Sequence, residues 1–237
     1  MKPYPHRHNF FIGITCFYLT LFTFSCSEST FDNRLNKGVI EYSISYPSIA
    51  EDNYMLDLMP KKMETSFYKG NFRSDIVAGM GLFKTSIISE KESNKLVHSV
   101  KMLNKKYSSS LSLEEIRDLN PNFKDIQITP INDTKEIAGY TCKAANVEVD
   151  GDSTWHFKIY YTDEININKP NRHTPYESIS GVLMQYEIIS YNTHMLFTAK
   201  KVVPLKDSID TKLGEDYEQV SPQRLKEEIE AIFAAVK

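Results

Sequence analysis

Val39-Ile40-Glu41-Tyr42-Ser43-Ile44-Ser45-Tyr46 alternates apolar and polar residues without interruption. Successive side chains of a β-strand point to opposite faces, so the even-numbered members of this stretch, from Ile40 to Tyr46, share one face. Such alternation is typical of a strand with one face on a hydrophobic core and the other in water. We therefore expect a sheet-forming strand over residues 39–46.

The same period of two recurs through the chain. Residues 155–161 repeat it, and two apolar runs over 182–189 and 195–203 flank Ser190-Tyr191-Asn192-Thr193-His194, which predicts a hairpin with an Asn-centred turn. Further strand candidates are 61–69, 71–78, 82–89, 95–102, 124–130 and 139–149. This succession predicts a meander of antiparallel strands.

Two segments have helical features instead. Residues 112–120 begin with a Ser cap and end before Pro121, and residues 221–237 begin with Ser221 as N-cap and Pro222 at the first helical position. The apolar stripe of the second segment is Leu225, Ile229, Ile232, Phe233 and Val236. We expect a mainly β (α+β) fold, a strongly bent antiparallel sheet covered on its concave face by helices, including this C-terminal amphipathic helix.

The first 25 residues have the features of an export signal. Lys2 and Arg7 precede an apolar run over residues 10–24, which as a helix reaches only about 22 Å against roughly 30 Å of hydrocarbon. Thr23-Phe24-Ser25-Cys26 resembles a bacterial lipobox, which implies lipidation of Cys26. An ordinary secretory signal cut elsewhere and an N-terminal membrane anchor are the alternatives.

This interpretation gives three regions: a lipoprotein signal peptide over 1–25, a lipidated cysteine with a flexible tether over 26–36, and a single β-rich domain over 37–237. The expected location is the cell envelope, lipid-anchored at the outer membrane and facing the periplasm. The membrane is then a partner through the N-terminal lipid, and the sequence does not identify a protein partner.

Charge and cysteine content narrow the function. The net charge of −3 becomes about −5 once residues 1–25 are removed, and a mildly acidic chain without a basic cluster is a poor nucleic-acid binder. Cys142 lies in a predicted strand, and with Cys26 lipidated it has no disulfide partner. We expect Cys142 to be buried and unreactive, the alternative being a reactive thiol.

No motif predicts catalysis, a metal site or a cofactor. His98, His156, His173 and His194 lack metal-ligand spacing, and His98 and His156 are expected to be solvated strand residues. No nucleophile elbow, dinucleotide fingerprint or phosphate loop is present, so we expect no catalytic residues and no enzyme. Met55, Met59, Met63 and Met80 are interpreted as core filler, with an adaptable ligand lining or copper(I) binding as alternatives.

Three stretches resemble a known family. Ile137-Ala138-Gly139-Tyr140-Thr141-Cys142-Lys143-Ala144, the strand 155–161 with Thr162-Asp163-Glu164-Ile165 after it, and residues 175–183 are similar to the GLPGLI family and to related lipoproteins that carry a domain of unknown function with a LolA-like fold. Where that family has Gly-Leu-Pro-Gly-Leu-Ile, this chain has Ser178-Ile179-Ser180-Gly181-Val182-Leu183. The resemblance implies a half-barrel like that of the LolA and LolB lipoprotein carriers, whose concavity takes acyl chains.

The leading hypothesis is thus an anchored, non-enzymatic binder or carrier of a lipid or other hydrophobic ligand. The candidate cavity residues are the apolar strand positions Tyr42, Ile44, Phe67, Phe72, Met80, Phe83, Trp155, Phe157, Ile159, Met184, Tyr186 and Phe197. Each of them could equally fill a solid core. The alternative functions are a structural or interaction subunit of an envelope complex, and a hydrolase with a dispersed polar site.

Overall fold

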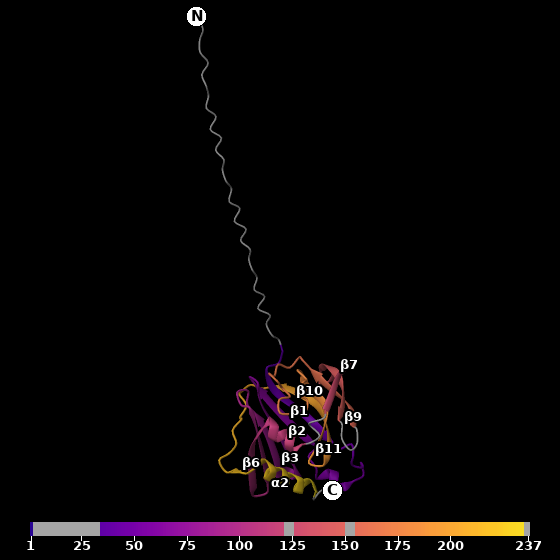
Figure 1. Cartoon of the computed structure of the whole chain (residues 1–237), viewed down its shortest axis with the longest axis vertical. Coiled ribbons are helices and arrows are strands. Elements are labelled where there is room, and N and C mark those ends of the chain that lie inside the picture. Colours follow the sequence, from indigo (N-terminus) through magenta and orange to yellow (C-terminus); the bar gives the residue numbers. More distant parts are fainter. Residues whose placement is uncertain (2–33, 121–125, 150–154, 235–237) are drawn as a thin grey trace. The chain divides into compact units, whose positions relative to one another are not determined.

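The computed structural model describes Met1 and residues 34–120, 126–149 and 155–234. The predicted signal peptide, Cys26 and Val236 lie outside the described residues. Within them, the strands form one twelve-stranded sheet in the order β12-β6-β5-β4-β3-β2-β1-β11-β10-β9-β8-β7 (Figure 1). The chain is therefore mainly β, as predicted, and its sheet is curved and antiparallel except for one parallel pair, β12 with β6.

The strands are β1 (Lys37–Ser45), β2 (Lys62–Tyr68), β3 (Asn71–Ala78), β4 (Phe83–Ser89), β5 (Lys95–Met102), β6 (Lys105–Ser112), β7 (Ile126–Ile137), β8 (Tyr140–Val149), β9 (Trp155–Thr162), β10 (Val182–Ser190), β11 (Thr193–Pro204) and β12 (Glu218–Gln219). The helices are η1 (Tyr54–Asp57), η2 (Gly79–Gly81), α1 (Leu113–Leu119) and α2 (Pro222–Ala234). Strands β6 and β12 were not predicted.

The sheet consists of two meanders that meet at one seam. Strands β1 to β6 follow one another in space as in sequence, and so do β7 to β11. The seam is the antiparallel pair of β1 and β11, in which Ile44 lies opposite Phe197. The first strand of the chain thereby becomes a central strand of the sheet.

Strand β1 confirms the predicted face. Ile40, Tyr42, Ile44 and Tyr46 are buried, while the residues between them are partly or fully exposed. The hairpin between β10 and β11 is also confirmed. Its two turn residues, Tyr191 and Asn192, have φ angles of 52° and 54°, the left-handed conformation that tight hairpin turns require.

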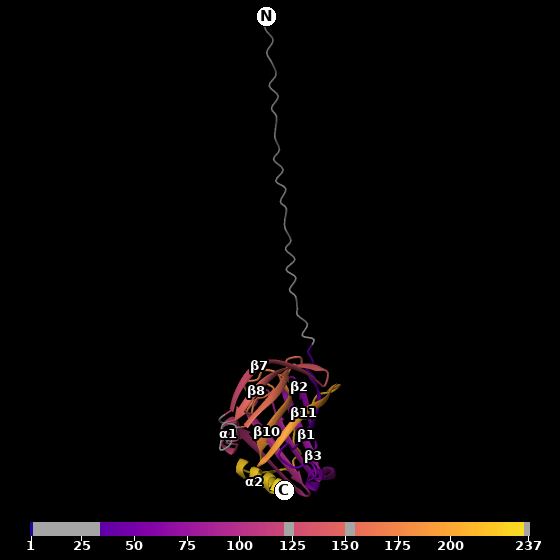
Figure 2. The same cartoon turned by 90° about the vertical axis from the view of Figure 1, so that its right-hand side faces the viewer.

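Both predicted α-helices are present. At the start of α1, Ser112 Oγ accepts from the Glu115 N–H and the Glu115 carboxylate accepts from the Ser112 N–H, which forms a capping box. Helix α2 lies at one end of the sheet (Figures 1 and 2). Its Leu225, Ile229 and Phe233 are buried. Among the described residues, no helix is long and apolar enough to cross a membrane.

Two hydrophobic clusters form most of the core. The larger one joins β1 to β5, β10 and β11 to α2 through residues such as Ile40, Phe67 and Leu225. The smaller one packs β8 and β9 against Tyr176 and Ile179 of the connection that precedes β10. Strand β8 contributes residues to both clusters: Cys142 belongs to the larger cluster and Val147 to the smaller one.

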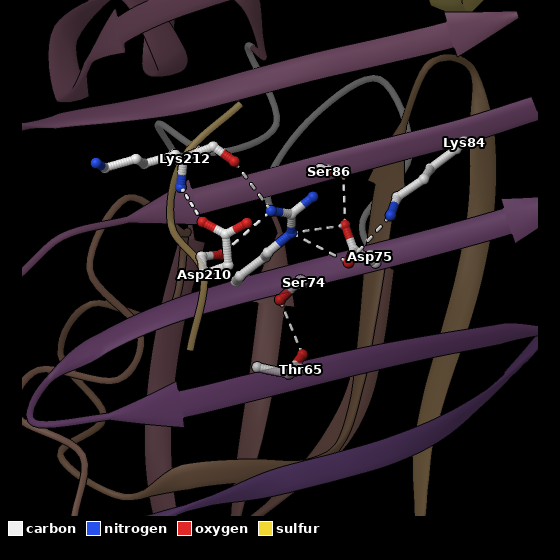
Figure 3. A network of polar contacts seen from close by, with 8 residues as sticks. Thr65, Ser74, Asp75, Lys84, Ser86, Asp210 and Lys212 are labelled. Atoms are coloured by element: carbon white, nitrogen blue, oxygen red, sulfur yellow. Dashed lines mark hydrogen bonds and ion pairs between the residues drawn. The ribbon is translucent and has the colours of Figure 1, made fainter. Parts of the chain in front are cut away.

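The opposite face of β3 and β4, which we call the outer face, is covered by the segment after β11. Arg73 Nη1 donates to the carbonyl oxygens of Asp210 and Lys212 at 3.1 and 3.3 Å (Figure 3). Arg73 Nε also donates to Asp75, which accepts from Ser86 Oγ at 2.5 Å. These contacts fix the segment that leads to β12 and α2.

Candidate functional site

The larger core cluster surrounds a cavity of about 250 Å³. Its wall comes from β1 to β6, β10 and β11, from helices α1 and α2, and from residues 167–176 of the connection between β9 and β10. The wall is mostly apolar. Ligand sites in proteins are typically concave and apolar with a few placed polar groups, so this cavity is the candidate site.

The structure divides the predicted cavity residues into several groups. Those in the cavity wall are Tyr42, Ile44, Phe72, Phe83, Tyr186 and Phe197. Those buried in the packing without lining the cavity are Phe67, Ile159 and Met184, each 0% exposed. Phe157 packs, partly buried, against the smaller cluster. Whether the wall residues contact a ligand stays a prediction.

Two predicted cavity residues require correction. Met80 is fully exposed in the short helix η2, where its φ of 55° turns the chain between β3 and β4. Trp155 is 37% exposed at the start of β9 and packs on the His194 ring, with 4.9 Å between centroids. Both residues continue an apolar alternation in the sequence. Met80, however, lies in a turn and Trp155 at the start of a strand, so neither reaches the cavity. The methionines that do line it are Met63 and Met195.

An aromatic group forms one part of the wall. The Tyr186 ring stacks on Phe197 at 5.0 Å and meets the edges of Tyr42 and Tyr176, each at 6.0 Å. The Tyr42 hydroxyl donates to the Leu183 carbonyl oxygen at 2.8 Å, and the Tyr176 hydroxyl donates to the Glu187 carbonyl oxygen. Burial raises the pKa of Tyr42, Tyr176 and Tyr186 well above the ordinary value.

The prediction that His98 is solvated is wrong. His98 is 8% exposed and lines the cavity, because its neighbours on β4 and the tip of the β10–β11 hairpin cover it. Its Nε2 lies 2.8 Å from Thr85 Oγ1, and its Nδ1 lies 3.5 Å from the Tyr191 hydroxyl. Burial lowers the pKa of His98 from 6.5 to about 4, so the ring is neutral near pH 7. His156 is exposed, as predicted.

Arg172 is a site residue that the sequence did not indicate. It lies in the connection between β9 and β10, is 8% exposed and lines the cavity. Its guanidinium donates to Ser89 Oγ and to the carbonyl oxygens of Ser89, Gly70 and Asn168. The guanidinium carbon also lies 4.9 Å from the centroid of the Phe72 ring. Arg172 therefore ties the connection to the ends of β2, β3 and β4.

A serine, a histidine and a glutamate are in contact elsewhere. His194 Nε2 lies 2.5 Å from the Glu187 carboxylate, and His194 Nδ1 lies 3.0 Å from Ser48 Oγ. None of the three lines the cavity. The contacts join the β10–β11 hairpin to the loop after β1. Polar residues clustered inside the cavity were the expected mark of a hydrolase, and this group lies outside it.

Cys142 is fully buried, as predicted. Its Sγ contacts the Tyr140 carbonyl oxygen at 3.4 Å, and burial is the largest cause that raises the pKa of the thiol to about 11. Over the described part of the chain, no group of three or more His, Cys, Asp or Glu residues could hold a metal ion. The candidate site is therefore the apolar cavity and its few polar groups.

Comparisons with known proteins give a family and a likeness to solved structures. The model of a domain of unknown function, DUF4412, matches residues 38–166, just over half of the 237-residue chain. No curated protein matches the sequence. Among solved structures, LprF from Mycobacterium bovis is similar at 12% identity and a TM-score of 0.32, over 75% of this chain and 89% of LprF.

Proposed function

This chain belongs to the DUF4412 family of domains of unknown function, and we propose that its domain binds a small apolar molecule, such as the acyl chain of a lipid, in the cavity. The single observation that supports this most is an apolar space of about 250 Å³ lined by the curved sheet and by helices α1 and α2. Large unfilled volumes in a core are destabilising, so a retained cavity favours an occupant.

The proposed role is that of a binder or carrier, not an enzyme. The polar groups of the wall are spread over different strands, and several are already engaged: Tyr42 with a carbonyl oxygen and His98 with Thr85. A neutral, buried histidine beside a threonine supports packing more than proton transfer.

The finer features of the resemblance belong to the same proposal. The chain shares with the GLPGLI family and with the LolA and LolB carriers a half-barrel whose helices close the concave face. Cys26 carries the lipid anchor, and the domain is held at the outer membrane on its periplasmic side. In that position the cavity can receive an acyl chain from the neighbouring bilayer.

The first test is to purify the chain carrying Cys26→Ala and to analyse its organic extract together with native mass spectra. A stoichiometric apolar molecule is the expected result. An empty protein that also fails to bind a fluorescent fatty acid would overturn the proposal and favour the interaction-subunit role.

A matched pair of variants on β3 locates the binding. Ile76 lines the cavity, whereas Val77 is 46% exposed on the outer face. Ile76→Trp fills part of the cavity and is expected to weaken binding of the fluorescent fatty acid, while Val77→Trp leaves it unchanged. Equal binding by both variants, with unfolding transitions showing both folded, would place the ligand outside the cavity.

A further inference from the structure

The charge of the cavity wall is opposite to that of the chain. The sequence has 31 Asp and Glu against 28 Lys and Arg, yet no acidic residue is found among the described residues that line the cavity. The wall does contain two cations, Arg172 and Lys226. Low-dielectric walls strengthen the field of such charges, so the interior attracts an anion.

Arg172 is the cation of the wall that, among the described residues, has no carboxylate partner. Its four hydrogen bonds all go to neutral acceptors, three backbone carbonyls and the Ser89 hydroxyl. Burial alone lowers its pKa, and no carboxylate contributes. A guanidinium has five N–H donors, so these contacts leave at least one N–H available.

Other shielded cations of this protein do have carboxylate partners. Arg73 Nε lies 3.1 Å from Asp75, and Lys226 Nζ lies 3.8 Å from Glu230. A buried charge normally needs an opposite charge, because removing it from water is costly. The exception at Arg172 therefore marks a place for an anion that the described residues do not supply.

We propose that Arg172 binds the carboxylate of a single-chain amphiphile, a fatty acid, whose acyl chain occupies the cavity. This assignment rests on the proposed function and specifies its ligand class. The volume of about 250 Å³ falls just below the roughly 300–1,000 Å³ of common ligand sites, so it favours one acyl chain over a two-chain lipid. Phe72, under the guanidinium and in the wall, joins the polar end to the apolar space.

The test compares two ligands that differ only in charge. Dodecanoate and dodecanol are titrated into the delipidated chain carrying Cys26→Ala at pH 8, where burial keeps His98 and His173 neutral. We expect dodecanoate to bind about tenfold more tightly, as one charged hydrogen bond predicts. Equal affinities would overturn the headgroup assignment and leave apolar binding intact, whereas no binding of either would overturn both.

Variants then identify the cation. Arg172→Gln is expected to reduce the preference for dodecanoate to less than about threefold, and Arg172→Lys to retain part of it. Lys226→Gln, at the other cation of the wall, keeps the full preference. A preference lost in Lys226→Gln and kept in Arg172→Gln would assign the carboxylate to Lys226 instead. If Arg172→Gln does not fold, the comparison of dodecanoate with dodecanol on the protein that retains Arg172 still decides the ligand class.

Discussion

Tyr42 and Tyr186 meet edge to face with 6.0 Å between their ring centroids, yet their hydroxyls differ. Tyr42 donates to the Leu183 carbonyl oxygen at 2.8 Å, whereas among the described residues the Tyr186 hydroxyl has no hydrogen-bond partner. We expect Tyr42→Phe to lower the free energy of unfolding by about 1 kcal/mol and Tyr186→Phe to change it by less than about 0.5 kcal/mol. Urea unfolding at pH 7 measures both, and equal losses would contradict the difference.

Ser99 and Ser86 lie opposite each other on the outer face, and we expect their replacement by alanine to affect stability in opposite directions. Ser99 Oγ is buried and has no hydrogen-bond partner within the described part of the chain, while Ser86 Oγ, opposite it on β4, donates to Asp75. Ser99→Ala removes an unsatisfied polar group and is expected to be neutral or stabilising by up to about 1 kcal/mol. Ser86→Ala, the matched control, should lose about 1–2 kcal/mol. Thermal unfolding ranks the pair, and a Ser99→Ala protein less stable than Ser86→Ala would refute the ranking.

His98 makes stability depend on pH. The unfolded chain protonates this histidine below pH 6.5, whereas the folded protein does so only at about pH 4. The stabilisation is therefore complete above pH 6.5 and decreases as the pH falls toward 4, by roughly 3 kcal/mol in total. Urea midpoints measured between pH 7 and 4 should show this slope, and His98→Gln should reduce it.

The slope measured for His98→Gln decides whether His98 causes the pH dependence. An identical slope in His98→Gln and wild type would show that His98 does not resist protonation.

Substitutions of Phe67 and Trp155 by alanine test which of the two side chains belongs to the core. Phe67 is 0% exposed in the larger cluster, so Phe67→Ala should cost about 3–5 kcal/mol. Trp155 is 37% exposed and packs on His194, so Trp155→Ala should cost only about 1 kcal/mol. Chemical denaturation measures both losses. If Trp155→Ala lowers the free energy of unfolding as much as Phe67→Ala does, Trp155 is part of the core.

The sequence pattern predicted the strands, helices and turns whose conformation depends on interactions between residues close in the sequence. The alternation of β1, the Ser112 cap of α1 and the turn at Asn192 all depend on neighbouring residues, and each is confirmed. Strand β6 was missed because Lys-Lys-Tyr-Ser-Ser-Ser-Leu-Ser offers few apolar residues to alternate. Strand β12 has only two residues and exists through its pairing with β6, more than 100 residues away.

The candidate site was less predictable, because part of it depends on contacts between residues far apart in the sequence. Tyr42 and Phe72 lie in the cavity wall because their strands have one buried face, which the sequence reveals. Arg172 becomes a site residue only because the connection between β9 and β10 folds back on Ser89, 83 residues earlier. No period or motif encodes that contact. Met80 and Trp155 show the converse, since alternation does not indicate where a strand ends.

The seam between β1 and β11 has a consequence for how the protein folds. Ser43 and Thr198 are register neighbours there although 155 residues separate them. Within each meander most strand pairs are joined by short loops, and the longer connections are those between β1 and β2 and between β9 and β10. The seam instead requires closure of almost the whole domain, and such long-range pairing slows folding. On refolding from denaturant, we expect the two meanders to gain structure first and the pairing of β1 with β11 to limit the rate at which the native state appears.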